Sequence, residues 1–144
     1  MGKRSIHIPM EKTREARQML KEYAGARLRV KVYPRKRPTL LKQLKVDLSD
    51  YNEHGIVRFD HRLVRRLNAD DWFFFEQYLT DLNNVWLIDR VLEGEDEVTK
   101  KIARDAFVNR KTSPELAEKY GLKERTIRWH KAKTLKRLAS MLLV

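Results

Sequence analysis

Residues 112–138 read TSPELAEKYGLKERTIRWHKAKTLKRL, and this stretch decides the fold that we expect for the end of the chain. Ser113 can cap a helix and Pro114 suits the first helical position, so a short helix is expected to begin at Pro114. Gly121 follows, and glycine readily takes the left-handed conformation that ends a helix in a tight turn. The residues after the turn predict a longer, basic helix that runs almost to the end of the chain.

The two expected helices carry apolar side chains at helical spacing, which should pack against each other. These side chains are Leu116, Ala117 and Tyr120 in the first helix and Ile127, Leu135 and Leu138 in the second. The opposite side of the second helix carries Arg125, Arg128, Trp129, Lys133 and Arg137. A helix with such donors on one face can enter the major groove of DNA, so the pattern predicts a helix-turn-helix. A helical hairpin with solvated lysines is the alternative.

Charge is distributed unevenly along the 144 residues, which carry 32 basic and 20 acidic side chains and a net charge of +12. Residues 1–46 hold 14 basic and 3 acidic side chains, residues 47–96 hold 5 and 12, and residues 97–144 hold 13 and 5. Two basic ends therefore flank an acidic middle. This uneven distribution indicates that the basic residues bind a polyanion, because charge that served solubility alone would be spread evenly. The length suits one domain or two small ones.

Several classes of protein are disfavoured by what the sequence lacks. The chain has no cysteine, and therefore no disulfide or thiolate metal site. No apolar run reaches the roughly 18 residues of a membrane span, and the N-terminus lacks the apolar core of a signal peptide. We therefore expect a cytoplasmic protein without a membrane partner. No phosphate loop, paired-histidine motif or nucleophile elbow is present, so neither an enzyme nor a cofactor is expected.

The N-terminal half contains one expected helix and one expected β element. Residues 10–26 suit a helix because Ala16, Met19, Leu20 and Tyr23 recur at helical spacing. Residues 27–33 alternate basic and apolar side chains, which favours a short strand or an extended arm that Pro34 and Pro38 would end. Between those prolines lies a cluster formed by Arg35, Lys36 and Arg37. This cluster is either a solvated loop or an arm that contacts phosphates.

The middle of the chain has weaker local patterns. A short helix is expected from Thr39, with an inward set formed by Leu40, Leu41, Leu44 and Leu48. Residues 56–60 should be extended, and residues 60–68 should form a helical turn or two. Residues 70–94 are hydrophobic on more than one face, which predicts a buried helix or an oligomer interface. A platform on which nucleic-acid bases stack is the other interpretation of these aromatic residues.

The expected fold is mainly α, with a possible short β element in a helical N-terminal domain. Residues 1–94 would form a basic arm and an aromatic-rich helical region for oligomerisation, and residues 95–144 a C-terminal tri-helical domain. Gly94 and the acidic residues after it would act as the hinge. Residues 97–109 should supply the third helix, with Ile102, Ala106 and Phe107 inward.

The stretch after residue 112 resembles region 4 of the sigma-70 class. The residues that carry the resemblance are Glu115, Leu116, Ala117, Gly121, Leu122, Thr126, Ile127, Arg128, Ala132, Leu135 and Leu138. This resemblance implies that Glu124, Arg125, Arg128 and Trp129 face base edges and phosphates. Lys123 departs from the family, which usually has a capping Ser or Thr there, and Trp129 replaces a smaller polar residue. The short chain and its charged N-terminal half look like the ArpU/RinA-type late-gene regulators of phages that infect Gram-positive bacteria.

The residue patterns predict a sequence-specific regulator that binds double-stranded DNA, and the resemblance implies a transcription activator of phage late genes in the bacterial host cell. The expected DNA contacts are Lys123, Glu124, Arg125, Arg128, Trp129, Lys131, Lys133 and Lys136, with Arg35, Lys36 and Arg37. Lys119 would add to the phosphate contacts. A homodimer through the aromatic helix is favoured, because a helix-turn-helix usually binds two half-sites.

Two other functions stay open at this point. A small-terminase-like DNA-packaging subunit also joins a helix-turn-helix to an oligomerisation helix. An accessory factor could instead bind RNA polymerase through acidic residues 70–97 and touch DNA only weakly.

Overall fold

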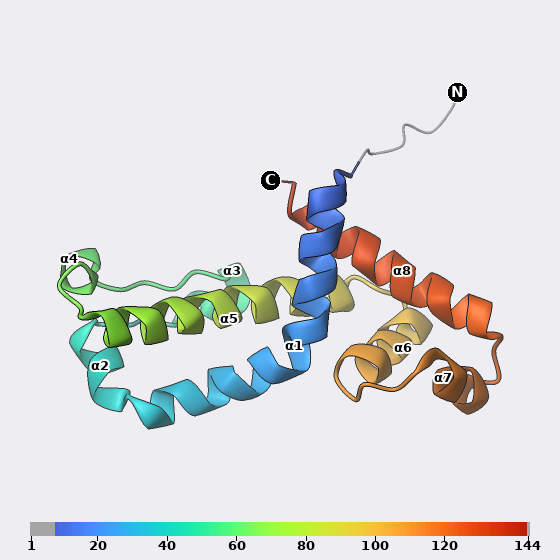
Figure 1. The fold of residues 1–144 in the computed structure, drawn as a ribbon, viewed down its shortest axis with the longest axis horizontal. Coiled ribbons are helices and arrows are strands. Elements are labelled where there is room, and N and C mark those ends of the chain that lie inside the picture. Colours follow the sequence, from blue (N-terminus) through green and yellow to red (C-terminus); the bar gives the residue numbers. More distant parts are fainter. Residues whose placement is uncertain (1–7, 144) are drawn as a thin grey trace. The chain divides into compact units, whose positions relative to one another are not determined.

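The computed structural model describes residues 8–143, and the chain is mainly helical (Figure 1). Its helices are α1 (Met10–Lys36), α2 (Pro38–Gln43), α3 (Tyr51–His54), α4 (His61–Val64), α5 (Ala69–Glu93), α6 (Glu97–Phe107), α7 (Ser113–Tyr120) and α8 (Glu124–Met141). Within residues 8–143 the only β pairing is an isolated bridge between Asp47 and Arg58. None of the helices in this part of the chain is both long and apolar enough to cross a bilayer. The N-terminal segment in which no signal peptide is expected lies largely outside the described residues.

The chain divides into two compact units. The first unit joins the described residues up to Ala24 to those from Ile88 onward, and the second comprises Gly25–Leu87. Both α1 and α5 contribute residues to each unit. The predicted domain boundary between residues 94 and 95 stays a prediction.

The helix predicted for residues 10–26 is confirmed, but the strand or extended arm predicted after it is wrong, because α1 continues to Lys36. Its buried positions keep the spacing of three and four residues. These positions are Ala16, Met19, Leu20, Tyr23, Ala26 and Tyr33. Leu28 and Val32, which suggested alternation, are instead exposed on the outer side of the helix. Pro34 lies within the last turn of α1, and Pro38 begins α2.

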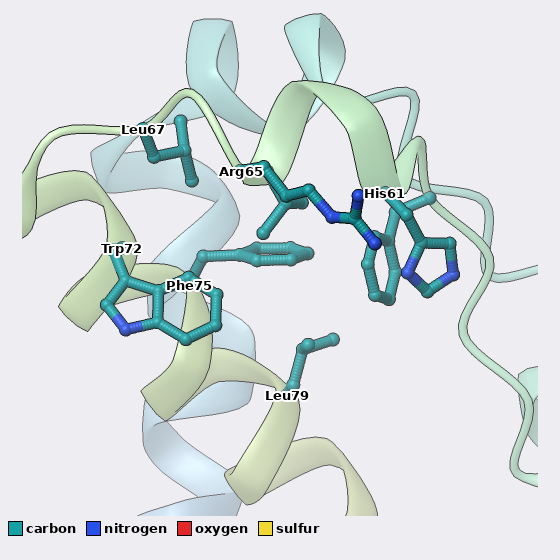
Figure 2. Close-up of a pocket in the computed structure, with 8 residues that line it drawn as sticks. His61, Arg65, Leu67, Trp72, Phe75 and Leu79 are labelled. Carbon is teal, nitrogen blue, oxygen red and sulfur yellow. The ribbon is translucent and has the colours of Figure 1, made fainter.

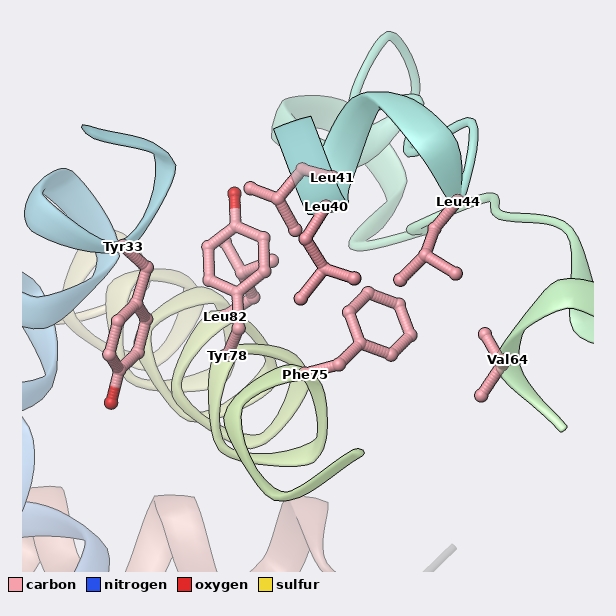
Figure 3. Close-up of a cluster of buried hydrophobic side chains, with 8 residues drawn as sticks. All are labelled: Tyr33, Leu40, Leu41, Leu44, Val64, Phe75, Tyr78 and Leu82. Carbon is pink, nitrogen blue, oxygen red and sulfur yellow. The ribbon is translucent and has the colours of Figure 1, made fainter. Parts of the chain in front are cut away.

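The second unit packs around a cluster of buried side chains from α1, α2, α4 and α5 (Figure 3). Its members are Tyr33, Leu40, Leu41, Leu44, Val64, Phe75, Tyr78 and Leu82. Tyr33 meets Tyr78 edge to face, with ring centroids 5.7 Å apart. The predicted inward position of Leu48 is wrong, because this side chain lies beyond the end of α2 and is 39% exposed. The helical turns predicted for residues 60–68 are confirmed by α4.

An ion pair with a buried carboxylate fastens α1 to α5 inside the second unit. The Arg29 guanidinium donates two hydrogen bonds to the Asp81 carboxylate, 2.7 and 3.0 Å long, and the Asp81 side chain is 2% exposed. Gln77 donates a third bond to the same carboxylate, 3.2 Å long. Such bidentate, charge-assisted bonds are the strong ones in a protein, and removing one partner leaves a buried charge uncompensated.

Gly55 ends α3 at a place where only glycine fits. Its φ angle is +68°, and a Cβ atom there would lie 2.6 Å from Cδ2 of the Trp86 ring. The indole of Trp86 donates a hydrogen bond of 3.2 Å to the carbonyl oxygen of Asn52, in α3 itself. The Trp86 ring therefore excludes any side chain at Gly55, and the positive φ independently favours glycine.

Helices α6, α7 and α8 of the first unit lie side by side (Figure 1). Their shared core is formed by Ile102, Leu116 and Ile127, one from each helix and each fully buried. The helix expected over residues 97–109 is confirmed as α6, which Asp96 caps by accepting a 2.8 Å bond from the N–H of Thr99. Each of the three helices thus buries one apolar side chain against the other two.

Candidate nucleic-acid interface

A capping box sets the start of α7. The Glu115 N–H donates to the Thr112 hydroxyl, and the Thr112 N–H donates to the Glu115 carboxylate over 3.1 Å. The cap is therefore Thr112 and not Ser113, because Thr112 stands three residues before the glutamate that completes the box. Ser113 becomes the first helical residue. The N–H and the hydroxyl of Thr112 both donate to the Glu115 carboxylate, and these two bonds lower the pKa of the Glu115 carboxyl below its ordinary value.

The turn between α7 and α8 has the conformation that the sequence predicts. Gly121 lies in the left-handed region, with φ +64° and ψ +34°, and its N–H donates to the carbonyl of Ala117. The N–H of Leu122 donates to the same carbonyl over 3.0 Å. Lys123 precedes α8 and makes no side-chain capping bond. The start of α8 therefore lacks the side-chain cap that the start of α7 has.

One side of α8 is buried and the other is exposed. Ile127, Thr134 and Leu138 are fully buried on the inner side. Arg125, Arg128 and Trp129 form what we call the outward face; both arginines are exposed, and Trp129 is 57% exposed. The Arg128 guanidinium makes one weak contact, 3.9 Å from the Glu124 carboxylate. The outward face thus presents two guanidinium groups and an indole to solvent.

Acidic residues of the loop between α5 and α6 engage the second half of α8. Lys133 Nζ lies 3.0 Å from the Asp96 carboxylate and 3.7 Å from the buried Glu95 carboxylate. The hydrogen bond to Asp96 raises the pKa of Lys133 above its ordinary value. The Arg137 guanidinium donates to the Gly94 carbonyl over 2.6 Å and lies 3.4 Å from Glu95. Lys133, one of the predicted DNA contacts, is therefore already paired within the chain.

A buried aspartate joins α6 to the end of α7. Asp105 is 7% exposed, and it accepts hydrogen bonds from Lys119 Nζ at 2.7 Å, the Tyr120 hydroxyl at 2.6 Å and the Asn109 amide at 2.9 Å. Burial pushes the pKa of Asp105 up, but the bonds from these donors outweigh burial and bring it down to about 2. Lys119, expected to contact phosphates, thus has a structural partner.

A second link joins α6 to α8 through a polar contact in the first unit. The Thr99 hydroxyl lies 2.7 Å from Nδ1 of His130 and also donates to the Asp96 carboxylate over 3.1 Å. Thr99 is fully buried. The outward face is thus carried by a helix whose opposite side is fixed to both α6 and α7.

The predicted contacts of the N-terminal half do not form an arm. Arg35 and Lys36 lie in the last turn of α1, and Arg37 stands between α1 and α2. The Arg37 guanidinium binds the Asp71 carboxylate and lies over the Phe74 ring, 4.9 Å from its centroid. These residues belong to the second unit, while all the other predicted contacts belong to the first. A contact between this cluster and DNA stays a prediction.

Two basic residues that sequence reasoning missed lie beside α8 in the first unit. Arg17 and Lys21 of α1 share the rim of a cavity of about 510 Å³ with Arg128 and Lys131 of α8. Apolar side chains complete its lining, namely Leu20, Phe107, Ala132 and Leu135. The spacing of four residues puts Arg17 and Lys21 on one side of α1, but only tertiary packing brings that side next to α8.

The comparisons with known proteins identify no family for this chain. No protein-family model matches the chain, and no curated protein or solved structure is significantly similar to it. Within residues 8–143 no group of three or more His, Asp or Glu side chains is arranged to hold a metal ion. The groups that the outward face exposes are the guanidinium groups of Arg125 and Arg128 and the Trp129 ring.

Proposed function

We propose that this chain is a sequence-specific DNA-binding transcription regulator in which α7 and α8 form a helix-turn-helix and α8 enters the major groove. The observation that carries the proposal is the outward face of α8, exposed on a helix whose inner side is locked to α6 and α7. A base-reading helix needs both properties, because its donors must be free and its position must be rigid.

Base reading and phosphate binding would fall to different residues. Arg125 and Arg128 have the forked guanidinium that pairs with the O6 and N7 atoms of guanine, and Trp129 offers an apolar ring for a thymine methyl group. Lys123, Lys131 and Lys136 would bind backbone phosphates. Arg17 and Lys21 extend this basic surface, since they line the same cavity as Arg128 and Lys131. Lys133 should contribute less, because Glu95 and Asp96 already neutralise it.

The biological role that we propose follows the resemblance to sigma region 4 and to the ArpU/RinA-type regulators. By that resemblance the protein would activate late genes of a phage, in the cytoplasm of the bacterial host. Footprinting of the DNA that flanks its own gene would test this role, because it reports the site, its symmetry and its length together. If the protein protects no segment of this DNA from cleavage, the proposed control of its own gene or of neighbouring late genes is wrong.

Arg128 is the residue on which base reading can be tested. Arg128→Ala should weaken binding to the footprinted site by about 1–3 kcal/mol and leave binding to unrelated DNA nearly unchanged. Arg128→Lys is the matched control, because it keeps the charge and loses the fork. It should lose most of the specific affinity and retain the non-specific affinity. An equal loss on both kinds of DNA for Arg128→Ala would contradict base reading.

Lys36 tests the cluster at the end of α1. If Lys36 binds a phosphate, Lys36→Ala weakens binding to every sequence alike and flattens the dependence of log K on log salt by about one unit. Glu22→Gln on the same helix is a control that removes an exposed charge of the opposite sign. If the salt dependence of Lys36→Ala equals that of the wild type, Lys36 is solvated and does not bind a phosphate.

A small-terminase-like packaging subunit is the second candidate function. The observation that favours it is the exposure of Trp72 and Phe73 at the start of α5, because packaging subunits assemble through such helices. A ring of many subunits in solution would support this function. A monomer or dimer that binds one promoter segment would support the regulator.

A further inference from the structure

Two large aromatic side chains face solvent at the start of α5. Phe73 is 71% exposed and Trp72 is 47% exposed. Asp70 and Glu76, both exposed, stand three residues before and after Phe73, which places each of them one turn from its ring. An exposed aromatic pair flanked by carboxylates is costly to leave in water and marks an interaction surface.

An aromatic pocket opens beside this pair, within the same unit (Figure 2). Its volume is about 520 Å³, and pockets of roughly 300–1,000 Å³ hold drug-sized ligands, so an aromatic side chain has room to enter. Trp72, Phe75 and Leu79 line one side, and Arg65 and His61 lie at the mouth, where Figure 2 shows the long Arg65 side chain reaching across.

The charges around the pocket and around Phe73 are of opposite sign, and neither set is paired within the chain. Among the described residues, Arg65 forms no ion pair, and neither do Asp70 and Glu76. One surface therefore contains an exposed aromatic residue, Phe73, that is flanked by carboxylates, and an aromatic pocket with a basic rim. A surface that carries both halves of a contact is self-complementary, which is what a twofold interface requires.

We propose that a second copy of this chain occupies the pocket: Phe73 of each protomer enters the pocket of its partner, and Glu76 meets Arg65 across the interface. Each contact is then made twice, once in each direction. Burial of the rings drives association, and the charges fix the register and select against other partners. This inference goes beyond DNA binding and does not depend on it, so it is tested on the free protein.

Sedimentation equilibrium of the full chain over a wide concentration range, at physiological salt, measures the association directly. The wild type should form dimers, and Phe73→Ala should weaken dimerisation by about thirtyfold or more, as expected for a buried aromatic hot spot. Leu28→Ala is the matched control, because Leu28 is an apolar residue of the same unit that is 66% exposed and does not line the pocket. It should leave dimerisation unchanged.

A charge exchange separates the interface from an effect on folding. Arg65→Glu and Glu76→Arg should each weaken the dimer, and the double variant should recover most of the wild-type affinity, because the pair is restored with its signs reversed. Circular dichroism would verify that every variant is folded. A wild type that stays monomeric, a larger ring, a dimer indifferent to Phe73→Ala, or a double variant without recovery would each overturn the proposal.

Discussion

Replacing Asp105 by asparagine should destabilise the first unit by an amount that can be worked out from the contacts of its carboxylate. Asp105 is almost fully buried and accepts bonds from Lys119, Tyr120 and Asn109. Its pKa falls from the ordinary 3.8 to about 2. One pKa unit corresponds to about 1.4 kcal/mol, so the charged form stabilises the fold by about 2 kcal/mol.

The sign of the pH dependence follows from the direction of this shift. Because the pKa of Asp105 is lower in the folded state, its contribution is fully present above about pH 4 and disappears as the pH falls toward about 2. Asp105→Asn keeps one acceptor oxygen and removes the charge. The variant should therefore lose about 2 kcal/mol of unfolding free energy at neutral pH, and the difference should shrink steadily in acid.

Urea unfolding followed by circular dichroism, in buffers stepped from neutral to acid pH, measures this difference. Glu118→Gln is the matched control, because Glu118 is exposed on α7 and makes no ion pair among the described residues. It should match the wild type within about 0.5 kcal/mol at every pH. A loss in Asp105→Asn that does not change with pH, or no loss at neutral pH, would refute this assignment of stability to the charged Asp105.

Other predictions concern single residues and can be checked by the same unfolding measurements. Gly121→Ala should cost about 1–2 kcal/mol through its positive φ alone, since open space surrounds the position. Lys123→Ser should stabilise the fold by about 1 kcal/mol, because it supplies the missing cap of α8, while it weakens DNA binding if Lys123 contacts a phosphate. Arg29→Met should cost about 3 kcal/mol or more, and pairing it with Asp81→Asn should recover part of the loss.

The α7–α8 hairpin could be predicted from the sequence because its signals are local. A cap, a glycine and apolar residues three and four apart all lie within one short stretch, and α6, α7 and α8 appear where they were expected. The expected cap, Ser113, lies one residue after the observed cap, because the glutamate that completes the capping box stands three residues after Thr112. The exposure of the outward face also followed from that local spacing.

The errors arose where distant residues decide the structure. Arg29 pairs with Asp81, 52 positions away, and this contact helps to make residues 27–33 helical where alternation suggested a strand. Local spacing places Lys133 and Arg137 on the exposed side of α8 and gives no sign of their acidic partner. This partner, Glu95, lies in the loop between α5 and α6. The nearness of Arg17 to α8 likewise depends on packing that no local pattern encodes.

The fit of Gly55 against the Trp86 ring has a consequence for recognising diverged relatives of this protein. A relative that keeps the tryptophan must also keep the glycine, because any Cβ would overlap the indole. If a smaller residue replaces the tryptophan, the overlap is relieved, yet the positive φ still restricts the position to glycine or asparagine. A relative can therefore change Trp86 and keep Gly55, but it cannot change Gly55 and keep Trp86. This asymmetry distinguishes shared ancestry from a chance likeness between helical proteins.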